Sequence, residues 1–190
     1  MNNKTCIKCK SRTTLNIKLV ASTAMFAALI TVATAFIKIP TALGYQHPGD
    51  SMVYLAASIL PGPYGIIASG LGGALADILS GYAYWAIPTF IIKCLNAVPF
   101  VLCRMILQKY GKDNKIINIP TLAMLIPTTA VTVFGYLVAN AILYDWTAAV
   151  AELVTWWVQP GIGALIFITV GIGLDAAKFK QRILPIVNGK

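Results

Sequence analysis

The basic residues of this chain are clustered, and the clusters alternate with long apolar runs. Thirteen of the fifteen Lys and Arg residues fall in three short segments, Lys4–Lys18, Arg104–Lys115 and Lys178–Lys190. Positively charged short loops of membrane proteins are retained on the cytoplasmic side. The pattern therefore predicts an integral membrane protein whose two termini both lie in the cytoplasm. Of the two remaining basic residues, Lys38 and Lys93, the second lies inside an apolar run.

The composition supports a membrane location and argues against a nucleic-acid partner. The chain is 58% hydrophobic and only 11% charged, whereas soluble domains carry about 25% charged residues. Its net charge of +9 is not arranged as a basic stripe within a nucleic-acid recognition motif. Because the charges flank apolar runs, we expect anionic membrane lipids to be the partner of these segments.

Two features near the N-terminus could indicate a metal site or a cleaved leader, and both are incomplete. Cys6 and Cys9 have the spacing of half a zinc site, but no second pair follows, so we expect two free thiols and no bound metal. The tripeptide 33–35 resembles a signal-peptide cleavage site. However, the apolar run Ile17–Ile39 is about 23 residues long, beyond the roughly 7–15 of a signal sequence. It is expected to be a retained helix.

The apolar runs predict an all-α bundle of six membrane helices. They are Ile17–Ile39, Ser51–Leu60, Gly65–Gly81, Ala86–Leu107, Ile119–Tyr144 and Ala149–Gly173. The second and third runs are short and form either a tight hairpin around Pro61–Pro63 or one broken span. Only the hairpin keeps all three basic segments on one side of the membrane. We therefore expect a basic cytoplasmic tail over residues 1–16, a six-helix domain over 17–175 and a second basic tail over 176–190.

Besides Lys18, Lys38 and Arg104 near the ends of the runs, three charged residues lie within them: Asp77, Lys93 and Glu152. Such groups cost at least about 2.5–3.5 kcal/mol each on insertion scales, so they normally face a cavity or a partner. At 1.5 Å per residue, Asp77 lies about 6 Å and Lys93 about 10 Å below the outer ends of their helices. An ion pair between Asp77 and Lys93 is therefore feasible. Such a pair could bind ligand, or it could only hold two helices together.

Polar side chains repeat on one helical face in two separate runs. In the fourth run, Thr89, Lys93 and Asn96 follow i, i+4, i+7 spacing. In the sixth run, similar spacing links Glu152, Trp156, Gln159 and Gly163. These two stripes predict a ligand site in the outer half of the bundle.

Aromatic residues crowd the same outer third of the predicted bundle. An interfacial aromatic belt accounts for most of them. Trp156 shares a predicted face with Glu152 and Gln159, so we expect it to stack on a flat ligand. Tyr82, which follows the third run, is a further candidate binding residue.

Several short motifs, taken in order, resemble a known family. They are Gly44–Asp50, Pro63–Gly65, Gly72, Ala76–Asp77, Ser80–Tyr82 and Pro88–Lys93. Together they resemble the substrate-binding S components of energy-coupling factor (ECF) vitamin transporters. The most similar subgroup is the riboflavin type, which also holds hydroxymethylpyrimidine transporters.

The resemblance implies a binding protein with no catalytic residues and no cofactor of its own. It implies a ligand beneath the loop Pro40–Asp50, with Gln159 as a contact, and it leaves open whether His47 touches ligand. It also implies that Ala24 and Ala28, one helical turn apart, dock on a transmembrane T component. The alternative for this pair is packing inside the six-helix bundle.

The expected ligand is a water-soluble vitamin or precursor, in the order hydroxymethylpyrimidine, pyridoxine, riboflavin-like compound. The resemblance implies that two partner ATPase subunits hydrolyse ATP to drive uptake, in a bacterial plasma membrane. Two alternatives remain. One is a self-sufficient secondary transporter in which Asp77 or Glu152 relays protons, which the absence of an inverted repeat disfavours. The other is a membrane scaffold protein. The sequence contains no Ser-His-Asp set, HExxH or Walker motif that would indicate an enzyme.

Overall fold

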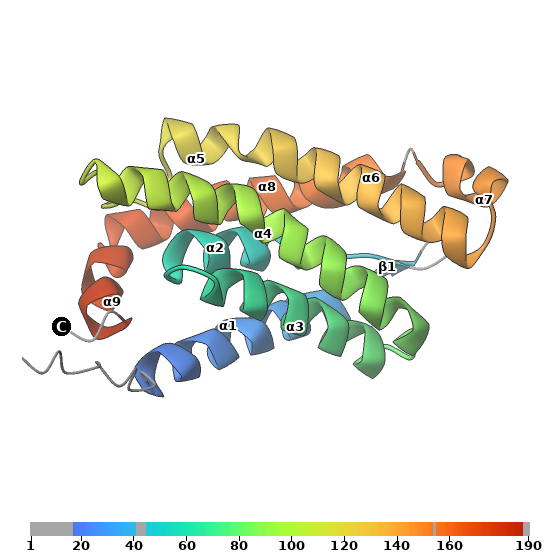
Figure 1. Ribbon diagram of the computed structural model, residues 1–190, viewed down its shortest axis with the longest axis horizontal. Coiled ribbons are helices and arrows are strands. Elements are labelled where there is room, and N and C mark those ends of the chain that lie inside the picture. The colour runs from blue at the N-terminus through green and yellow to red at the C-terminus, as the bar shows by residue number, and fades with distance from the viewer. Residues whose placement is uncertain (1–16, 41–44, 154, 188–190) are drawn as a thin grey trace, which may run out of the picture.

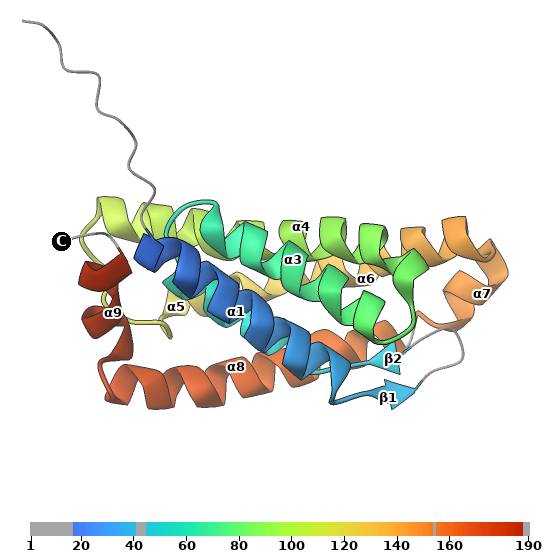
Figure 2. The same ribbon diagram turned by 90° about the horizontal axis from the view of Figure 1, so that it is seen from below.

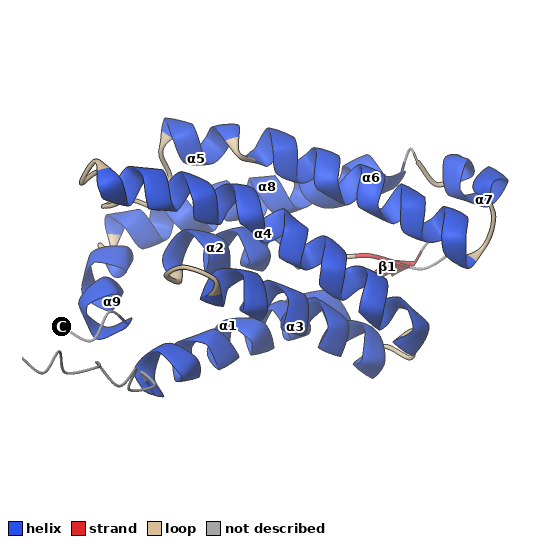
Figure 3. Cartoon of the chain, in the orientation of Figure 1, coloured by secondary structure: helices blue, strands red, loops and turns tan. Residues whose placement is uncertain are grey.

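The computed structural model describes residues 17–40, 45–153 and 155–187, and these residues are almost entirely helical (Figure 3). The long helices are α1 (Ile17–Ala35), α3 (Tyr64–Leu79), α4 (Ala86–Lys109), α6 (Leu125–Leu143) and α8 (Val158–Ala176). The short ones are α2 (Asp50–Ile59), α5 (Ile119–Ala123), α7 (Trp146–Ala151) and α9 (Phe179–Val187), with 3₁₀ turns η1 (Ala83–Trp85) and η2 (Thr155–Trp157). Strands β1 (Ile39–Pro40) and β2 (Tyr45–Gln46) pair antiparallel. The basic segment 1–16, with Cys6 and Cys9, lies outside the described residues.

Four segments are long and apolar enough to cross a membrane. They are Ile17–Ala35, Ala83–Lys109, Ile119–Leu143 and Thr155–Ala176, and α3 is a shorter apolar helix. Large apolar side chains are exposed all along them, including Leu29, Ile91 and Leu165. In water such a surface would aggregate, whereas in a bilayer it faces lipid. The chain is therefore an all-α membrane protein, as its sequence predicts.

Helix α2 lies at the centre of the bundle. Nine of its ten residues are buried, and it contacts α1, α3, α4 and α8. Tyr54 stacks on Phe100 of α4, with ring centroids 5.1 Å apart, and meets Phe167 of α8 edge-on. Because the helix faces protein on nearly every side, its residues are apolar all round rather than on one stripe. The second apolar run is thus a core helix.

Small residues let α3 pack closely against two neighbours at once. A Cβ on Gly72 would lie 2.7 Å from the carbonyl oxygen of Ala27 in α1. A Cβ on Gly73 would lie 2.8 Å from a side-chain carbon of Lys93 in α4. Adjacent glycines therefore serve opposite faces, which is the close approach that small residues permit between membrane helices.

The two ends of the bundle differ (Figures 1 and 2). One end, here the basic end, holds the start of α1, the α4–α5 connection and α9. The other, here the pocket end, holds β1, β2 and α7. At the basic end, buried Asp113 forms ion pairs with Arg104 of α4 and Lys180 of α9. Asp175 accepts hydrogen bonds from the backbone N–H groups of residues 116 and 117.

The sixth apolar run does not form one continuous helix, so its predicted start is wrong. Asp145 caps α7 by accepting a hydrogen bond from the Ala148 N–H. The chain then leaves helical geometry, and the Thr155 hydroxyl donates to the Glu152 carbonyl. Helix α8 begins only at Val158. Glu152 therefore does not share a helix face with Gln159 and Gly163.

Candidate functional site

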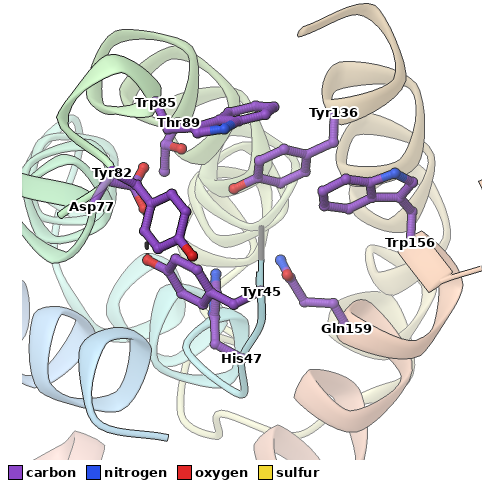
Figure 4. A pocket seen from close by; sticks show the side chains of 9 residues that line it. All are labelled: Tyr45, His47, Asp77, Tyr82, Trp85, Thr89, Tyr136, Trp156 and Gln159. Carbon is purple, nitrogen blue, oxygen red and sulfur yellow. Dashed lines mark hydrogen bonds between the residues drawn. The ribbon is translucent and has the colours of Figure 1, made fainter. Parts of the chain in front are cut away.

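A pocket at the pocket end of the bundle gathers aromatic and polar side chains from several helices and from strand β2 (Figure 4). It is lined by Tyr45, His47, Asp77, Tyr82, Trp85, Thr89, Tyr136, Trp156 and Gln159. Five of the predicted binding residues are among them: His47, Asp77, Tyr82, Trp156 and Gln159. Within the described part of the chain, no group of three His, Cys, Asp or Glu side chains could hold a metal ion.

Two stacked aromatic rings form one wall of the pocket. The rings of Tyr136 and Trp156 lie 4.7 Å apart at 4°, and Trp85 packs against Tyr136 with centroids 5.9 Å apart. Trp156 is only 4% exposed, whereas its neighbour Trp157 is 57% exposed. Trp156 therefore stacks on Tyr136 in this structure, and its stacking on a ligand stays a prediction. Asp77, Tyr82 and Tyr45 lie across the pocket from it, as Figure 4 shows.

Sequence reasoning missed Tyr136, although a signal for it exists. Thr132, Tyr136 and Asn140 recur every four residues in α6 and are all buried. This periodicity marks a polar inward face of the fifth apolar run. The predicted site considered the third, fourth and sixth runs only, so the fifth run's contribution was overlooked.

Beside the pocket, Lys93 and Asp50 form an ion pair with neither side chain exposed to solvent. The other oxygen of Asp50, Oδ2, accepts a hydrogen bond from Gln159 Nε2 at 2.9 Å. Lys93 also lies over the ring of Tyr136, 5.4 Å from its centroid. The expected Asp77–Lys93 pair is therefore wrong. Asp50 was overlooked because in the sequence it ends a polar loop, whereas in the fold it begins the buried helix α2.

Gln159 connects this ion pair with the pocket. Its Nε2 must face Asp50, because a carboxylate accepts hydrogen bonds and cannot donate them. The amide oxygen Oε1 is then left for the pocket that Gln159 lines. The space for Gln159 depends on Gly163, one turn further along α8. A Cβ there would lie 2.9 Å from the Cβ of Asp50.

Asp77 has a different partner. Its Oδ1 accepts a 2.7 Å hydrogen bond from the Tyr45 hydroxyl, which ties β2 to α3. Its Oδ2 is buried and forms no hydrogen bond. Tyr45 in turn packs against Tyr82 and His47, with centroids 5.3 and 5.6 Å away. Lys38 lies over the outer face of Tyr45, 5.1 Å from its centroid.

His47 faces the pocket as a neutral imidazole. Its Nδ1 accepts a hydrogen bond from the Gly49 N–H at 3.2 Å, so the ring proton lies on Nε2. Burial, assisted by the nearby charge of Lys93, lowers the pKa of His47 to about 3. The ring is therefore an uncharged hydrogen-bond donor at physiological pH. The backbone at position 49 lies close to both His47 and Thr34, which requires glycine there. A Cβ on Gly49 would lie 2.0 Å from the Thr34 hydroxyl.

Other predicted site residues lie outside the pocket lining. Lys93 is part of the buried ion pair described above, and Asn96 donates a hydrogen bond to Thr132 at 2.9 Å, which joins α4 to α6. Glu152 is buried at the end of α7. Ala24 and Ala28 are both exposed on α1. Packing inside the bundle would bury them, whereas a docking surface for a partner helix requires them to be accessible.

The pocket is nearly closed in this conformation. Its enclosed volume is about 30 Å³, whereas ligand pockets usually measure about 300–1,000 Å³. Such a space holds a few water molecules at most. A ring-sized ligand must therefore displace side chains from the pocket, and the space is more compatible with one ring than with three.

These features define an integral membrane protein with a pocket near one end of a helical bundle. Comparison with known proteins identifies its family. Residues 14–176 match the family described as ECF-type riboflavin transporter, S component, and the chain belongs to this family of vitamin-transport proteins. The chain is also 33% identical over 165 residues to a Pyrococcus woesei protein described as an uncharacterized protein in gap 3'region. That match covers 85% of this chain and 100% of the other.

Proposed function

We propose that this chain captures a water-soluble vitamin or vitamin precursor in the pocket and delivers it to partner subunits for ATP-driven uptake. The observation that carries the proposal is the stacked wall of Tyr136 and Trp156 facing the polar groups of His47, Asp77 and Gln159. A flat heteroaromatic ring carrying hydrogen-bonding groups is the ligand chemistry that such a lining recognises. Hydroxymethylpyrimidine, pyridoxine and riboflavin-like compounds all have that chemistry.

The proposed topology has six spans, with the pocket end outside and the basic end in the cytoplasm. It is supported by the positions of Arg104–Lys115 and Lys178–Arg182 at the basic end, because short basic loops are retained in the cytoplasm. It can be tested by cysteine labelling of intact cells on a background without native cysteines. A cysteine replacing Trp146 should react with an impermeant reagent, and one replacing Lys112 should not. The reverse result would overturn the orientation.

The proposed partners are a T component in the membrane and two cytoplasmic ATPases, as in the family that the chain resembles. Ala24 and Ala28 form the proposed docking surface for the T component, since small exposed residues permit close approach between membrane helices. The direct test is vitamin uptake by cells that express this chain with or without the partner subunits. ATP-dependent uptake only with the partners supports the proposal. Equal uptake without them would instead indicate a self-sufficient secondary transporter.

Trp156→Ala tests the pocket itself. Loss of a stacking contact or a good hydrogen bond is worth about 1–3 kcal/mol, which corresponds to a roughly 5- to 150-fold increase in Kd. Trp157→Ala is a matched control, because it removes the same kind of ring from the neighbouring position, which is exposed and outside the pocket lining. Calorimetry on the purified protein, with the vitamin found by mass spectrometry to co-purify with it, measures both. Equal affinity in the two variants would exclude this pocket.

A further inference from the structure

Two polar atoms of the pocket lining are buried without a hydrogen-bond partner: Asp77 Oδ2, an acceptor, and Trp156 Nε1, a donor. The Asp77 side chain is 5% exposed, and Tyr45 satisfies only Oδ1. Oδ2 has no donor in hydrogen-bonding geometry, although the Thr89 hydroxyl, which lines the same pocket, lies close enough to interact with the Asp77 carboxyl. A buried carboxylate oxygen without a donor is costly, about 1–3 kcal/mol or more for a charged group. A ligand that donates a hydrogen bond to Oδ2 would satisfy this oxygen.

The charges around the pocket point the same way. Lys93 and Asp50 neutralise each other in their ion pair, and His47 is uncharged. Asp77 is then the one acidic side chain of the lining, and Lys93 and Lys38 both lie close enough to interact with its carboxyl. The nearest lysine beyond this pair, Lys38, is exposed and lies over the ring of Tyr45. An acidic side chain in the lining favours a ligand that donates a hydrogen bond and disfavours a phosphorylated or carboxylated ligand.

The remaining polar groups restrict the ligand further. His47 offers an N–H donor, and Gln159 offers the oxygen left free by its bond to Asp50. The aromatic wall of Tyr136 and Trp156 lies opposite Asp77 (Figure 4). A ring lying in that space could receive a hydrogen bond from His47 on a ring nitrogen while it donates one to Asp77.

From this arrangement we propose that Asp77 selects the ligand by accepting a hydrogen bond from an amino group carried on a single flat heteroaromatic ring. The inference rests on the proposed function and narrows it to amino-substituted, unphosphorylated rings. Because the enclosed volume is small, a one-ring aminopyrimidine fits this chemistry better than the tricyclic ring of riboflavin. Asp77 is then a specificity-determining residue rather than only a partner of Tyr45.

The test compares ligand pairs in two proteins. Calorimetry measures the affinities of 4-amino-5-hydroxymethyl-2-methylpyrimidine, the same compound without its amino group, and riboflavin. Wild-type protein and Asp77→Asn are titrated, since asparagine keeps an oxygen for Tyr45 but cannot present two acceptors. Tyr45→Phe is the control that alters Asp77 only at Oδ1. A hydrogen bond to a charged group is worth about 1.5–3 kcal/mol, so the wild type should prefer the amino compound by roughly 10- to 150-fold.

The preference itself, rather than affinity alone, decides the inference. We expect Asp77→Asn to lose the preference for the amino compound and Tyr45→Phe to keep it. If Asp77 were only structural, Asp77→Asn would weaken all ligands by a common factor, and the inference would fail. Tight binding of riboflavin with none of either pyrimidine would also overturn it while leaving the proposed vitamin uptake intact. Conversely, amino-selective binding without partner-dependent uptake would support the inference and contradict the proposed transport role.

Discussion

Breaking the Lys93–Asp50 pair should cost more stability than any change on the lipid-facing surface. Both side chains are fully buried, so Lys93→Met leaves Asp50 with only Gln159 as a donor. Removing one partner of a buried ion pair typically costs about 3–5 kcal/mol, because the remaining charge is left uncompensated. For a chain of this size, about 1 kcal/mol shifts Tm by about 2–4 °C. We therefore expect Lys93→Met to lower the melting temperature by roughly 6–20 °C.

The assay is thermal unfolding of the purified protein in detergent, arranged as a double-substitution cycle. Asp50→Asn alone should also destabilise the protein strongly. The double variant should lose much less stability than the sum of the two single losses. The double variant carries no charge at either of these two positions, and the amide oxygen introduced at position 50 can still accept from Gln159. Lys109→Met is the matched control, since this lysine is exposed at the end of the same helix. Strictly additive effects, or a Lys93→Met melting temperature within about 2 °C of wild type, would refute the reasoning.

Three further outcomes follow from the geometry. Burial holds the pKa of His47 at about 3 in the folded protein, whereas the pKa of histidine in an unfolded chain is about 6.5. Between about pH 3 and pH 6.5, His47 is therefore protonated in the unfolded state and neutral in the folded state. Stability should therefore fall by up to roughly 3 kcal/mol from about pH 7 to about pH 4, and His47→Gln should flatten this slope in melting curves. Gly163→Ala should lower the free energy of unfolding by about 1–3 kcal/mol and weaken ligand binding, because the added methyl group forces α8 away from α2. Gly161→Ala, a control with open space around the glycine, should be near neutral. Equal melting temperatures of the two variants would contradict the close packing at Gly163. Ala24→Trp or Ala28→Trp should abolish co-purification with the T component yet leave binding by the isolated subunit unchanged, and intact uptake by both variants would remove the docking assignment.

The sequence shows which charged residues lie within apolar runs, but it does not show which residues they contact. An apolar run containing Lys93 shows that this charge needs a partner. Choosing between Asp77 and Asp50 requires the position of α2, which depends on packing around Tyr54 and Phe100. In the sequence, Asp50 is the last residue of a polar loop. Its burial depends on the helices that surround α2, and the sequence alone does not show how these helices pack.

The same limit applies to the start of the sixth run. Its residues are apolar on both sides of the break, so hydropathy alone continues the helix through it. At the break, Thr155 forms a local hydrogen bond with the Glu152 carbonyl over three residues, whereas the hydrogen bond of Asp145 determines where α7 begins. By contrast, Trp156 and Gln159 both line the pocket, because η2 leads directly into α8 and keeps their spacing.

The buried position of α2 also keeps Asp50 from direct contact with the bilayer. A helix that faces lipid tilts when the hydrocarbon layer becomes thinner or thicker. Only Met52 of α2 is not fully buried, so hydrophobic mismatch acts on the surrounding helices rather than on the helix that carries Asp50. Since Asp50 is joined to Gln159 and packs against Gly163, α2 and α8 should move as one body. Because Gln159 and most other pocket residues lie on helices that face lipid, ligand affinity should change between short-chain and long-chain phospholipid bilayers, with α2 following α8.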